Sequence, residues 1–177
     1  MIKTMRLKNF KAFKDTGQIE LKPITVLAGP NSSGKSSVLQ SLLLLKQTFE
    51  TEIPSVALNL EGRFLQFSDF EELTFLKPAL SKCEVSYQFL VSTPIPGGVI
   101  HKYFPDTDPN ILEDSEIYEL QSDIEISFRY KPYGKGESTV RPYRCIIRSL
   151  YGDKIGPEIS ITLHGTRWPA PQKGVQF

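Results

Sequence analysis

The amino-acid sequence predicts a mixed α/β fold of the α+β kind, and two patterns of apolar residues carry this prediction. In residues 24–50, a β-branched apolar run, a glycine-bounded loop and a stretch with helical spacing follow one another directly. In residues 83–163, apolar and polar side chains alternate with a period of two in separate runs, as in half-buried antiparallel strands. We therefore expect a strand–loop–helix unit and an antiparallel β-rich region in one chain.

Composition sets limits on what this chain does. Its 177 residues, 40% of them hydrophobic, are enough to bury the core of an ordinary domain. The 21 basic and 20 acidic residues give a net charge of +1, so the overall charge favours no polyanionic partner. Neither the two cysteines nor the two histidines show the spacing of a disulfide framework or a zinc site. No signal peptide or membrane-spanning run is found, and we expect a cytoplasmic protein without membrane contact.

The first twenty residues predict a β-hairpin. Met5 and Leu7 share one face of a strand over residues 1–10, and basic residues occupy the other face. A polar turn follows at residues 14–17, and residues 18–21 alternate as the second arm. Two antiparallel strands should therefore precede the glycine-bounded loop.

Residues 29–36 read Gly-Pro-Asn-Ser-Ser-Gly-Lys-Ser and match G-x-x-x-x-G-K-[ST], the phosphate-binding loop. Consecutive backbone N–H groups of such a loop turn inward onto phosphate oxygens, and a side chain at Gly29 or Gly34 would block that curl. The following helix presents its positive end to the anion. A buried strand at residues 24–28 and a helix at residues 34–50 are the expected flanks.

The motif assigns a role to each position of a nucleotide site. Lys35 should reach the β- and γ-phosphates, Ser36 should offer its hydroxyl to Mg²⁺, and Ser37 should touch the α-phosphate. The alternative is a Gly/Ser-rich turn that matches by chance. The predicted nucleotide-binding residues are Gly29, Pro30, Asn31, Ser32, Ser33, Gly34, Lys35, Ser36 and Ser37.

Weaker patterns predict the rest of the chain. Ser68 and Glu71 form an S-x-x-E capping pattern, which predicts a short helix from residue 69 to about residue 76. Strands are expected around residues 83–89, 124–130, 143–149 and 159–163, with a long polar loop at residues 93–113 and turns at residues 131–135 and 152–154.

These patterns divide the chain into four segments. The hairpin and the strand–loop–helix unit occupy residues 1–52, a connector with a short helix occupies residues 53–80, and the antiparallel β-rich subdomain occupies residues 81–165. Residues 166–177 contain prolines and no periodicity, as in a tail or truncation point.

The opening of the chain resembles a known family. Residues 7–13 read Leu-Lys-Asn-Phe-Lys-Ala-Phe, and a hairpin and the phosphate loop follow. This combination resembles the ABC-type ATPase heads of the SMC, RecF and OLD-like group, including bacterial AAA-family ATPases, over about residues 1–50 and loosely over 58–76. The resemblance implies the N-terminal lobe of a P-loop NTPase that binds ATP with Mg²⁺ and dimerises through its head. It also implies that Lys11 lies near the phosphates or ribose, while Ala12 stands where related heads often have serine.

Two elements of such heads do not occur in this sequence. Related heads have an apolar strand ending in Asp-Glu, which holds Mg²⁺ and positions water, and a signature segment resembling Leu-Ser-Gly-Gly. Neither pattern is found, so the chain resembles the N-terminal half of a head, and we assign no catalytic residue. The switch glutamine of related heads stays open among Gln66, Gln88 and Gln121.

Several functions remain open at this stage. The leading hypothesis is the ATP-binding portion of an ATPase, in DNA repair or anti-phage defence, with DNA or a nuclease as a further partner. The alternative is a regulatory module that holds nucleotide without hydrolysing it. A GTPase or nucleotide kinase ranks lower, because D-x-x-G at residues 153–156 has no accompanying Asn-Lys-x-Asp. A local basic cluster suits either DNA phosphates or an ordinary charged strand face; it comprises Arg141, Arg144, Arg148 and Lys154.

Overall fold

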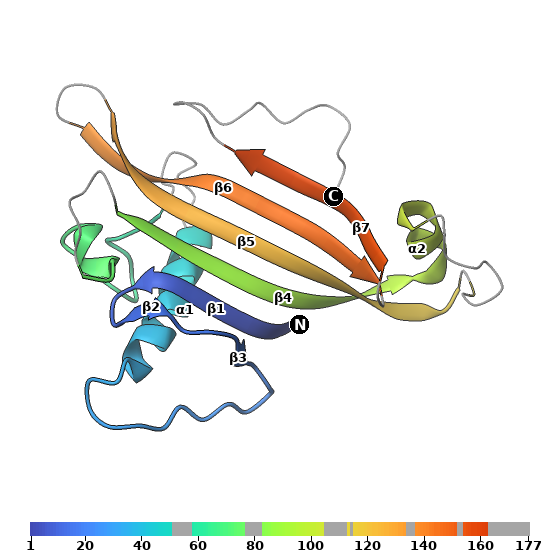
Figure 1. Cartoon of the computed structure of the whole chain (residues 1–177), viewed down its shortest axis with the longest axis horizontal. Helices are drawn as coiled ribbons and strands as arrows, with labels where there is room; N and C mark the ends of the chain where they lie inside the picture. Colours follow the sequence, from blue (N-terminus) through green and yellow to red (C-terminus); the bar gives the residue numbers. More distant parts are fainter. Residues whose placement is uncertain are drawn as a thin grey trace.

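The structure, a computed structural model, describes residues 1–50, 58–76, 83–104, 113, 115–133, 137–151 and 154–162. The strands are β1 (Ile2–Phe10), β2 (Phe13–Asp15), β3 (Ile19–Glu20), β4 (Glu84–Pro96), β5 (Ile117–Tyr133), β6 (Glu137–Tyr151) and β7 (Lys154–Thr162). The helices are α1 (Lys35–Phe49), the 3-10 helix η1 (Glu71–Leu73) and α2 (Gly97–Tyr103). All seven strands belong to one antiparallel sheet, and α1 crosses behind its β1 side (Figure 1).

Strand β1 joins the two predicted regions of the chain. The sheet order is β2-β1-β4-β5-β6-β7, and β3 also pairs with β1. Met5 lies opposite Phe89 and Leu7 lies opposite Tyr87, which places the apolar faces of β1 and β4 together. The predicted alternation in β1 is confirmed, because Met5 and Leu7 are buried. The N-terminal hairpin and the β-rich region therefore share one sheet.

The core lies between this sheet, α1 and the segment around η1. Tyr87 occupies its centre, with edge-on contacts to Phe10 and Phe128 and a stacked contact with Phe89. Phe10 is fully buried and Phe13 is partly buried against the same cluster, as expected of two core aromatics. Apolar side chains of the other elements complete it, including Val38, Leu44, Leu45, Phe67, Phe70 and Leu73. These contacts fix the start of α1 against the β1–β2 turn.

The predicted buried strand at residues 24–28 is wrong for this structure. These residues belong to no strand, and the side chains of Ile24 and Val26 are 84% and 82% exposed. Leu27, by contrast, packs against the core cluster. A β-branched run forms a strand only where a neighbouring strand takes up its backbone hydrogen bonds. Among the described strands, the pairings join β1 to β2, β3 and β4 and leave these residues outside the sheet.

The predicted helix at residues 69–76 is reduced to the single 3-10 turn η1. The predicted capping box does not form, because the N-cap residue of η1 is Phe70 and no side chain caps it. Instead, Glu72 N–H donates to Asp69 Oδ1 at 2.8 Å and Ser68 N–H donates to Glu72 Oε2 at 3.1 Å. After η1, Thr74 turns to extended backbone and bridges to Phe10, which ends the helix.

The predicted loop beginning at residue 93 is also corrected. Strand β4 continues to Pro96, where it pairs with Ile117, and α2 follows. A second small cluster, built around buried Ile100 and Phe104, explains this extension. Local proline and glycine signals favoured a loop, but pairing with β5 and this cluster determine the structure. Residues 105–112, 114, 134–136 and 152–153 of the predicted loops and turns lie outside the described residues.

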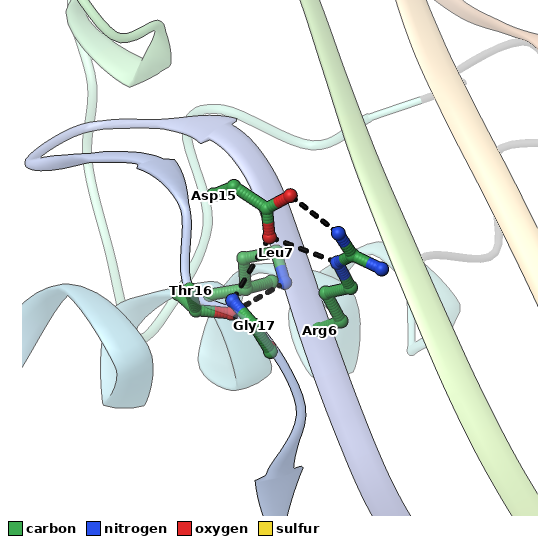
Figure 2. Close-up of polar contacts among 5 residues, drawn as sticks. All are labelled: Arg6, Leu7, Asp15, Thr16 and Gly17. Carbon is green, nitrogen blue, oxygen red and sulfur yellow. Dashed lines mark hydrogen bonds and ion pairs between the residues drawn. The ribbon is translucent and has the colours of Figure 1, made fainter.

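The turn after β2 is held by side-chain contacts to β1 (Figure 2). Both Asp15 oxygens accept from Arg6, at 2.8 and 2.6 Å, and Gly17 N–H donates to Asp15 Oδ1 at 2.9 Å. Thr16 Oγ1 accepts from Leu7 N–H at 3.0 Å. Hydrogen bonds from Arg6 and then Gly17 hold the pKa of the Asp15 carboxyl well below its usual range. The charged carboxylate thus stabilises the hairpin.

None of the helices within the described ranges is both long and apolar enough to cross a bilayer.

We expect Asp15→Asn to lower the melting temperature slightly at neutral pH, because the hairpin loses a charged acceptor at an exposed site. The folded-state pKa of Asp15 is depressed, so its contribution is present above its unfolded pKa of about 4 and is lost as pH falls below that value. The difference in melting temperature between variant and parent should therefore shrink on acidification. Glu20→Gln, which removes a carboxylate from an exposed pair with Lys22, is the matched control. A difference that stays constant between pH 7 and pH 3 would contradict this assignment.

We expect Tyr87→Phe to keep or raise the stability of the chain. The Tyr87 hydroxyl is buried without a hydrogen-bond partner among the described residues, and an unsatisfied buried hydroxyl costs roughly 1 kcal/mol or more. Tyr87→Ala should instead lose about 3–5 kcal/mol, because it leaves a cavity among three aromatic rings. Urea denaturation measures both changes. A clear loss of stability in Tyr87→Phe would show that the hydroxyl has a partner.

Candidate functional site

The phosphate-loop sequence adopts a tight turn that enters α1 directly. Gly34 is the N-cap residue, with a φ of 92°, and Gly29 has a φ of 152°. Both values lie in the region that favours glycine. A Cβ added at Gly34 would also lie 2.4 Å from the Phe13 ring. Two independent reasons therefore favour glycine at position 34: its positive φ, and the Phe13 ring, which leaves no room for a Cβ.

The loop presents positive charge at the start of α1. Lys35 Nζ donates to the carbonyl oxygens of Gly29 and Pro30, at 2.7 and 2.6 Å, so the ammonium group lies over the loop. No side chain caps the helix, and the first turn contains no acidic residue. Ser36 is exposed and Ser37 is half-buried beside it. The half-buried Lys35, the uncapped N–H groups and the helix dipole together suit an anion.

The β1–β2 turn lies beside this loop and carries Lys11. Its backbone is unusual, because Asn9 and Lys11 have φ values of 55° and 47°. Two hydrogen bonds hold the turn to the end of η1 and the residues after it, from Lys11 N–H to Leu73 O at 2.7 Å and from Phe75 N–H to Asn9 O at 3.0 Å. Lys11 and Phe13 of the same turn thus reach α1 and Gly34 from a fixed base.

The Lys11 side chain bridges α1 and the segment of residues 58–68. Its Nζ donates to Gln40 Oε1 at 3.0 Å and lies 4.6 Å from the centroid of the Phe67 ring. Sequence reasoning placed Lys11 at the site but missed Gln40 and Phe67. The spacing of Gln40, four residues after Ser36, was the available signal, since residues i and i+4 share a helix face.

The three candidate switch glutamines have different surroundings. Gln66 forms a β-bridge with Glu61 and lines an open cavity of about 430 Å³ together with Phe67 and Ser68. Gln88 donates from Nε2 to Asp123 Oδ1 at 3.0 Å on the sheet, and Gln121 is exposed on β5. Of the three, Gln66 is the one whose sequence neighbour contacts Lys11.

The predicted basic cluster is partly neutralised within the sheet. Arg148 contacts Asp123 at 3.3 Å and Glu158 at 2.6 Å, and these acidic partners raise the pKa of its guanidinium. Arg144 is exposed, while the side chains of Arg141 and Lys154 lie outside the described part of the structure. This pairing supports the interpretation of the cluster as a charged strand face.

The carboxylates considered as catalytic candidates also have structural surroundings. Asp69 accepts the N–H of Glu72, and Asp123 accepts from Gln88 and Arg148. Glu71 begins η1. Across the described ranges, no three His, Cys, Asp or Glu side chains come together in a group that could hold a metal ion.

Comparison with known proteins identifies the family. The family model described as "AAA ATPase domain" matches residues 1–160, which is well over half of the chain and includes the phosphate loop. Searches of curated proteins and of solved structures returned no match. The match supports nucleotide binding, and the chain belongs to the AAA ATPase domain family.

Proposed function

We propose that this chain is the ATP-binding portion of an ATPase of the SMC, RecF and OLD-like kind, with residues 29–37 as the phosphate site. The observation that carries the proposal is the Gly34–Lys35 geometry at the uncapped start of α1. Lys35 already lies over the loop and would exchange its two carbonyl partners for oxygens of the β- and γ-phosphates. The inward N–H groups of the loop would hold the same oxygens.

The residues present suit Mg-ATP. Ser36 is exposed in the first helical turn, where the motif places the hydroxyl that contacts Mg²⁺. When bound, the metal would neutralise charge on the terminal phosphates. Ser37 lies next to it for the α-phosphate, and Lys11 approaches from the β1–β2 turn. Gln66 is our candidate for the switch glutamine, because Phe67 links its segment to Lys11.

Hydrolysis should need elements beyond those seen in this chain. Asp69 accepts a backbone N–H and Asp123 forms an ion pair with Arg148, and no apolar strand ending in Asp-Glu occurs in the sequence. Head dimerisation, with DNA or a nuclease as partner, belongs to the same proposal.

A regulatory module that binds nucleotide without turnover is the second candidate. The position of Asp123 favours it, since that carboxylate is held by Gln88 and Arg148 on the sheet rather than at the phosphate loop. The two candidates share the same binding site and differ in whether phosphate is released.

Lys35→Ala should weaken binding of Mg-ATP by roughly tenfold to a hundredfold, because hydrogen bonds to charged groups contribute about 1.5–3 kcal/mol. Isothermal titration calorimetry on the 177-residue chain measures this change. Lys46→Ala is the matched control, since it removes an exposed lysine from the same helix near its other end. Equal affinity in parent and Lys35→Ala would remove the central claim.

The 177-residue chain should bind Mg-ATP yet release phosphate at no more than a trace rate. Lys35 and the loop amides stabilise phosphate charge, but turnover also needs a carboxylate that orients water. A polypeptide that includes a C-terminal half should show turnover and ATP-dependent dimerisation. Phosphate release is compared between these proteins, with Lys35→Ala as the control for contaminating ATPases. Robust Lys35-dependent turnover by the chain alone would reveal an overlooked base, and Asp69, Glu71 and Asp123 would be tested first.

A further inference from the structure

The Lys11 ammonium group is held between two elements that the sequence separates. Gln40 Oε1 of α1 accepts its hydrogen bond at 3.0 Å, and the Phe67 ring lies 4.6 Å away on the other element. Gln40 is half-buried, and Phe67 is only 5% exposed, so neither partner is a freely moving surface group. The Lys11 backbone is itself fixed by its hydrogen bond to Leu73. These contacts limit the positions that the Lys11 side chain samples.

This held ammonium lies close to the start of α1. Gln40 follows Ser36 by four residues, which is about 6 Å along a helix axis and on the same face. Helical side chains lean toward the N-terminus, which favours a Gln40 amide on the side of the first turn. Phe13, the first residue of β2 and two positions after Lys11, packs against Gly34 at the helix start. Gln40 and Phe13 therefore place the Lys11 side chain on the side of α1 that leads to the phosphate loop.

We propose that Gln40 and Phe67 are positioning residues that hold Lys11 for the terminal phosphate of bound ATP. This inference rests on the proposed ATP site, which already includes Lys11, and adds two residues that position its side chain. The terminal phosphate is the expected target because Ser36, on the same helix face as Gln40, is the motif's Mg²⁺ position between the last two phosphates.

The chemistry of an ammonium group allows Lys11 to contact Gln40, Phe67 and a phosphate at the same time. Lysine has three N–H donors, of which Gln40 takes one while the Phe67 face contacts the cation without using a lone pair. Donors remain for phosphate oxygens. A lysine whose side chain is already ordered loses less conformational entropy on binding, so the two neighbours should increase its contribution to affinity. They should matter only when the phosphate that Lys11 contacts is present.

The test compares binding of Mg-ATP and Mg-ADP to the 177-residue chain by calorimetry. We expect Lys11→Met to weaken ATP binding roughly tenfold while changing ADP binding less than about twofold, as for one charge-assisted hydrogen bond. Gln40→Leu and Phe67→Leu should each reduce the ATP-over-ADP preference by a smaller factor, on the order of threefold, since lysine keeps its charge but loses its order. Lys14→Met is the matched control, because it removes an exposed lysine from adjacent β2.

A double-variant comparison separates positioning from a merely structural role. In the Lys11→Met background, Gln40→Leu should have no further effect on the ATP-over-ADP preference, because the group it positions is gone. The proposal is overturned if the preference is unchanged in Lys11→Met, if ATP and ADP weaken equally, or if the Gln40→Leu effect persists without Lys11. Circular dichroism melting of each variant checks folding, and Lys11→Arg, which keeps a donor, should restore part of the preference. If the parent chain binds ATP through Lys35 and Lys11→Met keeps the same ATP-over-ADP preference, this inference alone is contradicted. If the parent chain binds no nucleotide, the proposed function is contradicted as well.

Discussion

The pairing of β1 with β4 is the constraint on which the rest of the described structure depends. It places Met5 and Leu7 against the aromatic side chains of β4 and so creates the centre of the core. It also fixes the end of β1, where the chain turns through Phe10 to Phe13. Without a fixed β1, neither the Phe13 ring that packs on Gly34 nor the Lys11 side chain that contacts α1 would have a defined position.

The turn that follows β1 connects this core to the candidate site. Positive φ values at Asn9 and Lys11 cost free energy in residues with a Cβ, and the surrounding hydrogen bonds to Leu73 and Phe75 stabilise them. As a result one short turn contacts the N-cap glycine, the face of α1 and the segment of residues 58–68. Strained backbone beside a phosphate loop is consistent with a site whose geometry matters more than local stability.

Charged side chains have different partners in the outer part of the sheet and at the start of α1. Across the outer part of the sheet, Asp123 and Glu158 hold Arg148, and Glu84 contacts Arg129. Such exposed pairs contribute little to stability, but they neutralise Arg148, one member of the basic cluster that was considered as a nucleic-acid surface. At the start of α1, Lys35 has only backbone carbonyls as its observed partners. Within the described residues, Lys35 therefore has no acidic partner at the start of α1.

The sequence by itself determined the glycine-bounded loop, helix α1 and the alternation of the principal strands, because each depends on local spacing that side chains impose directly. Gly34 and Lys35 were identified from their neighbours in the chain, and Met5 and Leu7 from a period of two. Tertiary structure alone decided whether residues 24–28 form a strand and which residues Lys11 contacts. A β-branched run becomes a strand only when another strand accepts its hydrogen bonds, and local sequence contains no information about that partner. Lys11 contacts Gln40, 29 positions away, and Phe67, farther along the chain, because sheet pairing and core packing bring these residues together; no local spacing specifies such contacts.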